Sequence, residues 1–177
     1  MEIIKQPTQI PVDQDELIDV VDEHDTIIGT VMRSQKDSVA GYYRSVLAFI
    51  VSPSGKLCFL RRTASKAYPL EWALVGGGVQ SGESYDVAFA REIAEEASID
   101  VSKHQTRFLG LVKPSEFPSK YFKAVYEIRI DTEHVNYTPT DFCESCWLLP
   151  NETNASTLDK SIHDLFYLVN RFYGAAQ

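Results

Sequence analysis

A run of three glycines followed closely by a helix with three carboxylates is the feature that most limits how this chain can fold. The glycines are residues 76–78, and Glu92, Glu95 and Glu96 follow in the next segment. Their i, i+3 and i+4 spacing predicts that all three side chains lie on one face of an α-helix. The sequence therefore predicts a glycine turn beside an acidic helix face.

Apolar residues predict the opposite face of the same helix. Ser84 is a suitable N-cap, so we expect the helix to begin near Tyr85. The residues expected to pack on a sheet are Val87, Ala90, Ile93, Ala94 and Ala97. With this stripe buried, the glutamates are expected to point outward or into a groove.

The acidic face has two interpretations from its residues alone. An isolated Glu-x-x-Glu-Glu is most often a solvated surface, although like charges at this spacing destabilise a helix by about a few tenths of a kcal/mol per pair. The second interpretation is a site for Mg²⁺, which takes its oxygen ligands from a few carboxylates, waters and substrate phosphates. The full spacing around the glutamates favours the second.

That spacing resembles the Nudix box, Gly-x5-Glu-x7-Arg-Glu-U-x-Glu-Glu-x-Gly-U, in which U is a bulky aliphatic residue. Every charged position is filled in this chain, which reads Gly77-x5-Glu83-x7-Arg91-Glu92-Ile93-x-Glu95-Glu96-x-Ser98-Ile99. Only Ser98 departs from the pattern. Glycine there would suit a left-handed helix C-cap, in which another residue costs about 1 kcal/mol. The departure therefore concerns the end of the helix more than the chemistry.

The resemblance implies an α/β fold, an α/β/α sandwich with a mixed sheet. It also implies a hydrolase that cleaves a diphosphate linkage in a nucleoside diphosphate derivative or related compound, with water activated by Mg²⁺ or Mn²⁺. Carried over by position, Glu92 and Glu96 would be the principal metal ligands and Glu95 a further ligand or orienting group. The carbonyl of Gly77 would be an additional metal contact.

Glu83 and Arg91 are expected to support this site. They are eight residues apart, about two helical turns, so they can pair if the loop folds back over the helix. By the resemblance they would hold the loop against the helix.

Four residues outside the box are candidates for contacts with the substrate. Arg61 and Arg62 end an expected strand and could meet a phosphate, although arginines at strand ends are common on surfaces. Asp141 and Glu144 lie shortly before Trp147, in a region where some relatives carry an additional acid. The box does not decide whether one of its own glutamates or such an outside carboxylate acts as the general base.

The acidic composition limits the partners. The 177 residues carry a formal net charge of −8, and 44% of them are hydrophobic, enough for a sizeable core. We expect a single domain over residues 1–177, with a loose arm over residues 1–14. Because coating nucleic acid needs a basic face, the expected partner is a small phosphate-containing substrate.

The cysteines and the hydropathy pattern predict the compartment. Three cysteines, an odd number, and an N-terminus without a signal-peptide pattern predict a reducing cytoplasm. The longest apolar run, residues 46–51, is too short to span a bilayer and fits a buried strand. Cys143 and Cys146 have zinc-knuckle spacing, but the four histidines supply no matching pair.

Alternating and apolar patterns predict the elements around the box. Strands are expected at residues 17–22, 26–31, 42–52, 56–62, 108–112 and 121–130, the first four as two hairpins. The last strand has a polar face of Lys123, Glu127 and Arg129, which would line a groove or meet water. A closing helix is expected from about Thr157 to Tyr173.

Two other functions share parts of this pattern. The opening at residues 16–23 and 29–33 also resembles isopentenyl-diphosphate isomerases, which share the fold and use a cysteine, a glutamate and a metal held largely by histidines. Residues 76–78 supply neither Cys nor His, so this alternative lacks its chemistry. A non-catalytic nucleotide-binding module would have no need of the box acids. ADP-ribose, a dinucleotide, a nucleoside triphosphate and an isoprenoid diphosphate stay open as substrates, as does a homodimer through the N-terminal hairpin.

Overall fold

The computed structural model describes residues 15–174. The expected N-terminal arm, residues 1–14, lies outside these residues, and so do residues 175–177. The strands are β1 (Leu17–Val21), β2 (Ile27–Met32), β3 (Tyr43–Val51), β4 (Leu57–Arg62), β5 (Trp72–Ala73), β6 (Val75–Gly78), β7 (Gln105–Val112), β8 (Tyr121–Arg129) and β9 (Phe142–Leu148). The helices are α1 (Tyr85–Ala97) and α2 (Leu165–Tyr173), with short 3-10 helices η2 (Arg33–Ser38), η3 (Val101–Lys103) and η4 (Pro150–Glu152).

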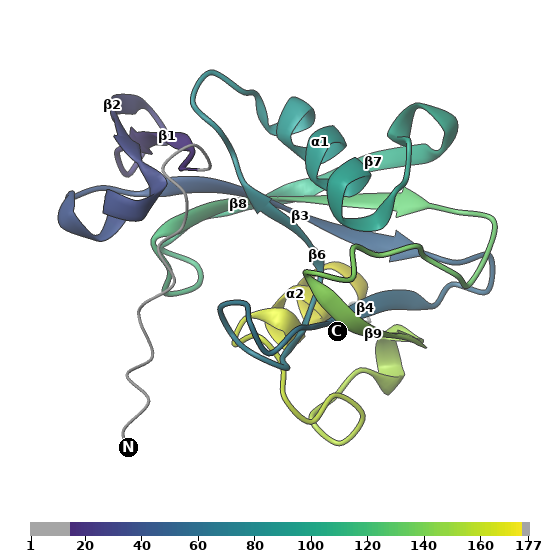
Figure 1. Cartoon of the computed structure of the whole chain (residues 1–177). Coiled ribbons are helices and arrows are strands. Elements are labelled where there is room, and N and C mark those ends of the chain that lie inside the picture. The colour runs from purple at the N-terminus through teal and green to yellow at the C-terminus, as the bar shows by residue number, and fades with distance from the viewer. Residues whose placement is uncertain (1–14, 175–177) are drawn as a thin grey trace, which may run out of the picture.

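Seven strands form one mixed sheet (Figure 1). Its path is β5-β4-β3-β8-β7, with β6 paired to β3 and β9 paired to β4. β3 and β8 run parallel along their whole length, whereas the other pairs are antiparallel. The expected hairpin between β3 and β4 is paired only at its turn, where Val51 faces Leu57. Beyond that turn the two strands diverge, because β3 takes β6 as its neighbour and β4 takes β5 and β9.

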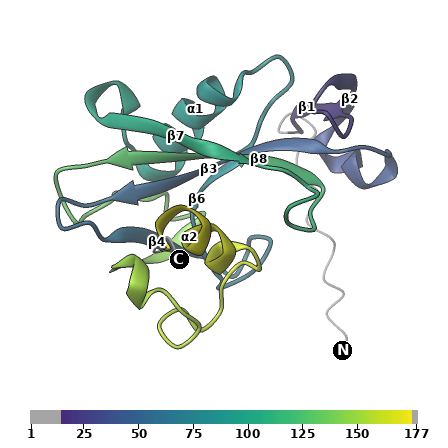
Figure 2. The same cartoon turned by 180° about the vertical axis from the view of Figure 1, so that it is seen from behind.

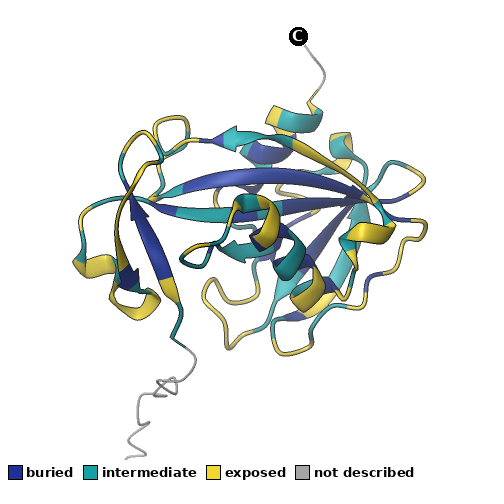
Figure 3. Ribbon diagram, turned by 90° about the horizontal axis from the view of Figure 1, so that it is seen from above, coloured by how far each residue is buried: buried dark blue, intermediate teal, exposed yellow. Residues whose placement is uncertain are grey.

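The two helices cover opposite faces of the sheet (Figures 1 and 2). α1 packs Ala88, Phe89 and Ile93 into one buried cluster with β3 and β8 residues such as Val46 and Ala124. α2 packs on the other side, and the buried residues of that cluster are Phe49, Val51, Leu57, Phe59, Trp72, Leu74, Val112, Val125, Leu158, Leu165, Leu168 and Val169. The central strands are accordingly buried on both faces (Figure 3). The expected α/β/α sandwich with a mixed sheet is confirmed.

The start of α1 agrees with the sequence, but its buried face does not. Ser84 caps the helix by accepting a hydrogen bond from the Val87 N–H, and the helix begins at Tyr85. Val87 is 55% exposed, and Ala94 is exposed as well, so the predicted apolar stripe is wrong at both positions. The buried residues of the helix are instead Ala88, Phe89, Glu92, Ile93 and Ala97. A carboxylate therefore lies on the packed face, since the helix is rotated relative to the prediction.

The predicted closing helix is wrong over its first half. α2 begins at Leu165, and the preceding segment lies beside β5 instead. The Trp72 backbone N–H donates to the Lys160 carbonyl oxygen at 2.6 Å, and the Ile162 backbone N–H donates to the Trp72 carbonyl oxygen at 3.0 Å. Leu158 is buried in the α2 cluster without being helical. Pairing with a strand edge satisfies the backbone groups that a helix would have satisfied.

The polar face of β8 is divided: Lys123 lines a cavity and Arg129 meets water, as predicted, whereas Glu127 is enclosed. Lys123 is 7% exposed and Glu127 is 3% exposed, while Arg129 is exposed. Lys123 forms an ion pair with Asp164 at the start of α2, and Glu127 accepts a hydrogen bond from the Tyr173 hydroxyl. Polar contacts thus join β8 to both ends of α2.

The predicted N-terminal hairpin is confirmed as the antiparallel pair β1 and β2. It forms a separate two-stranded sheet, joined to the end of β3 by a bridge between Val21 and Tyr42. Ile27 and Ile28 on β2 are exposed, but a homodimer through this surface stays a prediction.

Cys58, Cys143 and Cys146 are all free thiols. Within residues 15–174, no helix combines the length and the hydropathy needed to cross a bilayer.

Candidate active site

The glycine run forms β6, which lies antiparallel to β3 with Gly76, Gly77 and Gly78 opposite Leu47, Val46 and Ser45. Gly76 has a φ of +148°, and a Cβ there would lie 2.1 Å from the Val46 carbonyl oxygen. Only glycine fits this backbone at this distance from β3. The run therefore forms a stretch of β6 without side chains, where the sequence predicted only a turn.

Two box glutamates lie directly against this strand. A Cβ at Gly77 would lie 2.4 to 2.6 Å from the carboxylate atoms of Glu92, so that carboxylate packs on the bare backbone. Glu96 Oε2 accepts a hydrogen bond from the Gly76 N–H at 2.9 Å. Glu95 differs from both, because its side chain is 60% exposed. The acidic face of the sequence is thus split between two enclosed carboxylates and one in solvent.

Arg91 joins the loop before α1 to the glutamates. Its guanidinium makes two parallel hydrogen bonds to Glu83, at 2.8 and 2.9 Å, and donates to the Gly78 carbonyl oxygen at 3.0 Å. It also donates to Glu92 Oε1 at 2.8 Å and to Glu95 Oε2 at 3.4 Å. Hydrogen bonds from Arg91 lower the pKa of Glu83. The geometry is that of the expected loop-to-helix contact.

The two enclosed carboxylates are unfavourable as bare anions. Burial, together with the neighbouring charges of Glu92 and Asp141, raises the pKa of Glu96 to about 8. Burial also raises the pKa of Glu92, against the stabilising effect of Arg91. A divalent cation beside them would favour both charged forms.

The donor set suits a hard cation that is shared with a substrate. All three side chains supply carboxylate oxygens, and Gly77 leaves room for one of them against the backbone. Within residues 15–174, no three His, Cys, Asp or Glu side chains converge into a ready-made metal cage. Mg²⁺ is typically held by one or two carboxylates, with waters and phosphate oxygens completing its shell. The residues present therefore fit a Mg²⁺ or Mn²⁺ ion whose coordination shell would be completed by water and substrate.

The four candidates outside the box divide into two groups. Arg61 and Glu144 face each other across β4 and β9, and their charged groups pair at 3.2 Å. Arg62 lies close enough to Glu96 to lower its pKa, and Asp141 close enough to raise it. Asp141 also forms an ion pair with Lys66. The structure therefore brings Arg62 and Asp141 to the box, and leaves Arg61 and Glu144 engaged with each other.

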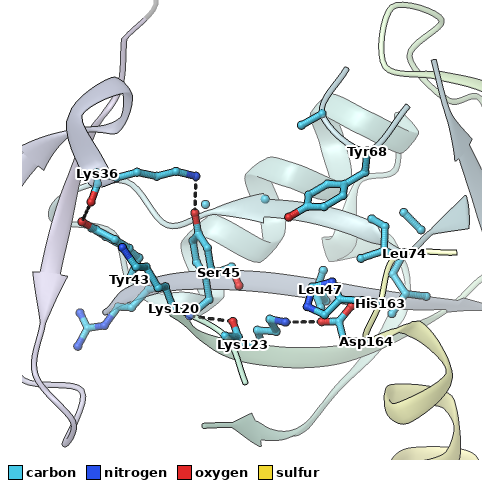
Figure 4. A pocket seen from close by; sticks show the side chains of 18 of the residues that line it. Lys36, Tyr43, Ser45, Leu47, Tyr68, Leu74, Lys120, Lys123, His163 and Asp164 are labelled. Carbon is cyan, nitrogen blue, oxygen red and sulfur yellow. Dashed lines mark hydrogen bonds and ion pairs between the residues drawn. The ribbon is translucent and has the colours of Figure 1, made fainter. Parts of the chain in front are cut away.

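A cavity of about 590 Å³ opens on the α2 face of the sheet (Figure 4). Six cationic residues line it, together with the carboxylates of Asp37 and Asp164. The cationic residues are Arg33, Lys36, Arg44, Arg62, Lys120 and Lys123. Four of the six form ion pairs with carboxylates, so among residues 15–174 Lys36 and Arg62 are the cations of the lining without such a partner. Such a cavity favours anionic ligands.

The cavity and the box carboxylates lie on opposite sides of β6. Gly77 and Gly78 line the cavity, but Glu92, Glu95 and Glu96 do not. Gly77 is paired with Val46, whose side chain is in the α1 cluster, whereas Gly78 is paired with Ser45, which lines the cavity. Because these positions carry no side chains, only one backbone thickness separates the two.

Sequence reasoning missed most of the cavity lining. Lys36, Asp164 and His163 carried no recognisable pattern, because they come from segments far from the box. The available signals were Arg62 at the end of its predicted strand and Lys123 on the polar face of an otherwise apolar strand.

The sequence profile of the NUDIX domain matches residues 41–168. The chain belongs to the Nudix family. A Nudix hydrolase from Nostoc sp. is 41% identical over 89% of this chain and 96% of its own length. A Nudix hydrolase from Deinococcus radiodurans is 34% identical over 90% of this chain and 95% of its own. These matches identify the chain as a Nudix hydrolase, an enzyme of the pyrophosphohydrolase class.

Solved structures agree with the Nudix assignment. A crystal structure of a Deinococcus radiodurans protein, 34% identical in sequence, superposes with a TM-score of 0.81 and covers 89% of this chain and 99% of that one. The MutT protein from Methanosarcina mazei is 23% identical and superposes with a TM-score of 0.61 over 74% of this chain and 92% of that chain. At that identity the likeness concerns the fold alone.

Proposed function

We propose that this Nudix hydrolase cleaves a diphosphate linkage in a nucleoside diphosphate derivative or related small molecule, using Mg²⁺ or Mn²⁺. The observation that carries the proposal is the position of Glu92 and Glu96. Both carboxylates are fixed against a strand without side chains, and the other side of that strand opens into a cationic cavity. Anionic substrate and hard cation are thus brought to one edge.

These contacts support the roles that the family resemblance implies for the box residues. Glu92 and Glu96 would be the principal ligands, with Glu95 as a further ligand or orienting group and the Gly77 carbonyl as an additional contact. When bound, the ion supplies charge neutralisation at the phosphate oxygens and lowers the pKa of a water that attacks phosphorus. Arg91 positions Glu92 directly.

The loop before α1 and the residues outside the box have supporting roles in the same proposal. Glu83 holds Arg91, and through it the loop. Arg62, close to Glu96 and on the cavity wall, would bind a substrate phosphate. Asp141 is our candidate outside the box for accepting the proton of the attacking water. Arg61 and Glu144 would act on substrate only by giving up their mutual ion pair.

An assay of product release over a panel of candidate substrates tests the proposal. Nucleoside diphosphate conjugates, nucleoside triphosphates and isopentenyl diphosphate are incubated with the protein in Mg²⁺ or Mn²⁺, and phosphate-containing products are separated. We expect cleavage of at least one conjugate or triphosphate that is abolished by EDTA. Glu96→Gln should lose at least about 10²-fold of this activity, a size typical of losing one preorganised electrostatic group.

The matched control is Glu23→Gln, because Glu23 has an exposed side chain in the turn between β1 and β2. Both variants should retain cooperative unfolding. Isomerisation of isopentenyl diphosphate without any hydrolysis would contradict the proposal. So would hydrolysis that is unaffected by Glu96→Gln.

A further inference from the structure

The cavity has a second cationic end, away from the box glutamates. Lys36, from η2, lies at this end beside Tyr43 and Lys120, across the cavity from Tyr68 and Leu74 (Figure 4). The Lys36 ammonium donates to the Tyr121 hydroxyl at 2.7 Å. It also lies 5.4 Å from the centroid of the Tyr121 ring. A half-buried lysine is thus held against a neutral phenol rather than an acid.

The charge of Lys36 has no carboxylate partner among residues 15–174, whereas two of its cationic neighbours do. Arg33 forms an ion pair with Glu16 at 2.6 Å, and Lys120 lies 3.9 Å from Asp37. An ammonium has three donor hydrogens, and Tyr121 uses one of them. Two donors and the full charge are therefore left for an anion in the cavity.

This end of the cavity is built before any ligand arrives. Tyr43 is 1% exposed, and its hydroxyl donates to the Lys36 carbonyl oxygen. The Tyr43 N–H donates to the Lys120 carbonyl oxygen at 2.8 Å. One buried tyrosine thus fixes the backbone of both lysines, which reduces the entropy lost when they bind a ligand.

The strand register gives the distance from the box. On β3, Ser45 is opposite both Gly78 and Lys123, and Tyr43 is opposite Tyr121. Two residues along a strand span about 7 Å, so the backbone of Tyr121, whose hydroxyl holds Lys36, lies about that far along the sheet from the position opposite Gly78. This separation is comparable to the size of one sugar ring with its substituents.

From these contacts, and building on the proposed hydrolase function, we propose that Lys36 and Tyr121 form a subsite for a phosphate monoester. The monoester would belong to the part of the substrate that lies away from the scissile diphosphate. A dianionic phosphate suits a lysine that acts as a point charge and has no carboxylate partner among the described residues. Lys36 and Arg33 precede residue 41, so these two groups lie outside the stretch that matches the NUDIX profile.

The test is equilibrium binding of two matched ligand pairs, measured by calorimetry in EDTA. The pairs are coenzyme A with dephospho-coenzyme A, and NADPH with NADH. Each pair shares a nucleoside diphosphate and differs by one phosphate monoester on ribose. We expect the phosphorylated member of at least one pair to bind about tenfold more tightly, as for a hydrogen bond to a charged group.

Lys36→Met should remove this preference, and Lys36→Arg should keep most of it. Lys103→Met is the control for net charge, because Lys103 is exposed and does not line the cavity. Equal binding within both pairs would overturn the proposal, and so would a preference that survives Lys36→Met in a protein with wild-type thermal stability. Binding in EDTA requires no turnover, so this result does not depend on whether the chain hydrolyses any of the ligands.

Discussion

Adding a single methyl group at Gly77 should impair catalysis without preventing folding. Its φ lies outside the left-handed region, so alanine can adopt the backbone, but the new Cβ would overlap the Glu92 carboxylate. That carboxylate is the end of a flexible side chain and should move away from β6. We expect Gly77→Ala to lower kcat about 10²-fold, the scale of a misplaced catalytic group.

Steady-state kinetics with thermal unfolding checks the Gly77 prediction. Gly29→Ala is the matched control, because a Cβ there meets nothing within 4 Å. Retention of wild-type kcat in a folded Gly77→Ala protein would show that the Glu92 position against β6 has no part in catalysis.

Ser98 carries the strain that its place in the box predicts. It ends α1 in the left-handed conformation, with φ of 55° and ψ of 34°, and its N–H donates to the Ala94 carbonyl oxygen at 3.1 Å. Ser98→Gly should raise the free energy of unfolding by about 0.5 to 1 kcal/mol, since glycine adopts this backbone freely. Urea denaturation measures the change. A lower stability for Ser98→Gly would mean that the serine side chain makes a compensating contact.

At the scale of single residues, the sequence located the charged groups but not their burial. The spacing of the box identified Glu83, Arg91 and the glutamates because covalent spacing is visible in a sequence. The burial of Glu92 depends on how α1 is rotated against β6, and alanine-rich helices leave that rotation poorly specified. A strand of three glycines, which lets Glu92 approach, then fixes it.

Among the elements, the hairpin β1–β2 supports the loop between β6 and α1. Asp19 is 5% exposed and accepts hydrogen bonds from the Ser81 hydroxyl at 2.6 Å and from the Gly82 N–H at 3.5 Å. The Ser81 N–H donates to the Leu17 carbonyl oxygen at 2.8 Å. The hairpin thus holds the loop that carries Glu83, and Asp19 is a positioning residue.

Asp19→Ala should therefore loosen that loop. We expect a loss of about 1 kcal/mol in the free energy of unfolding, because the Ser81 hydroxyl and the Gly82 N–H lose a buried acceptor. Hydrogen exchange of the Gly82 amide should accelerate. The fold decrease in kcat should be larger than the fold change in KM. Asp19→Asn keeps an acceptor oxygen and should recover most of both. Unchanged exchange at Gly82 in Asp19→Ala would remove the hairpin from the account of the site.

The elements themselves were predictable where local pattern decides them. The hairpin and α1 have clear caps, turns and periodicity. The first half of the closing helix was wrong because Leu158 and Ile162 satisfy a helical apolar period while the segment actually pairs with Trp72 of β5. A non-local strand edge competes there with a local helix, and sequence periodicity cannot weigh the two.

At the scale of the whole molecule, the candidate site involves both faces of the sheet. α1 brings acids to one side of β6, and β3, β8, η2 and the start of α2 enclose a cationic cavity on the other. Cavity residues such as Lys36 and Asp164 are more than a hundred positions apart in sequence. Their approach follows from the parallel pairing of β3 with β8 and the packing of α2, which no single segment encodes.

Direct measurement of Mn²⁺ binding tests the central claim, that Glu92 and Glu96 hold a divalent cation at the β6 edge. Free Mn²⁺ is followed by electron paramagnetic resonance during titration of the wild type, Glu92→Gln, Glu96→Gln and the control Glu23→Gln. We expect Glu92→Gln and Glu96→Gln each to weaken binding at least about tenfold, since each removes a ligand charge. Glu23→Gln should bind as the wild type does. Wild-type Mn²⁺ affinity in both folded box variants would contradict the account.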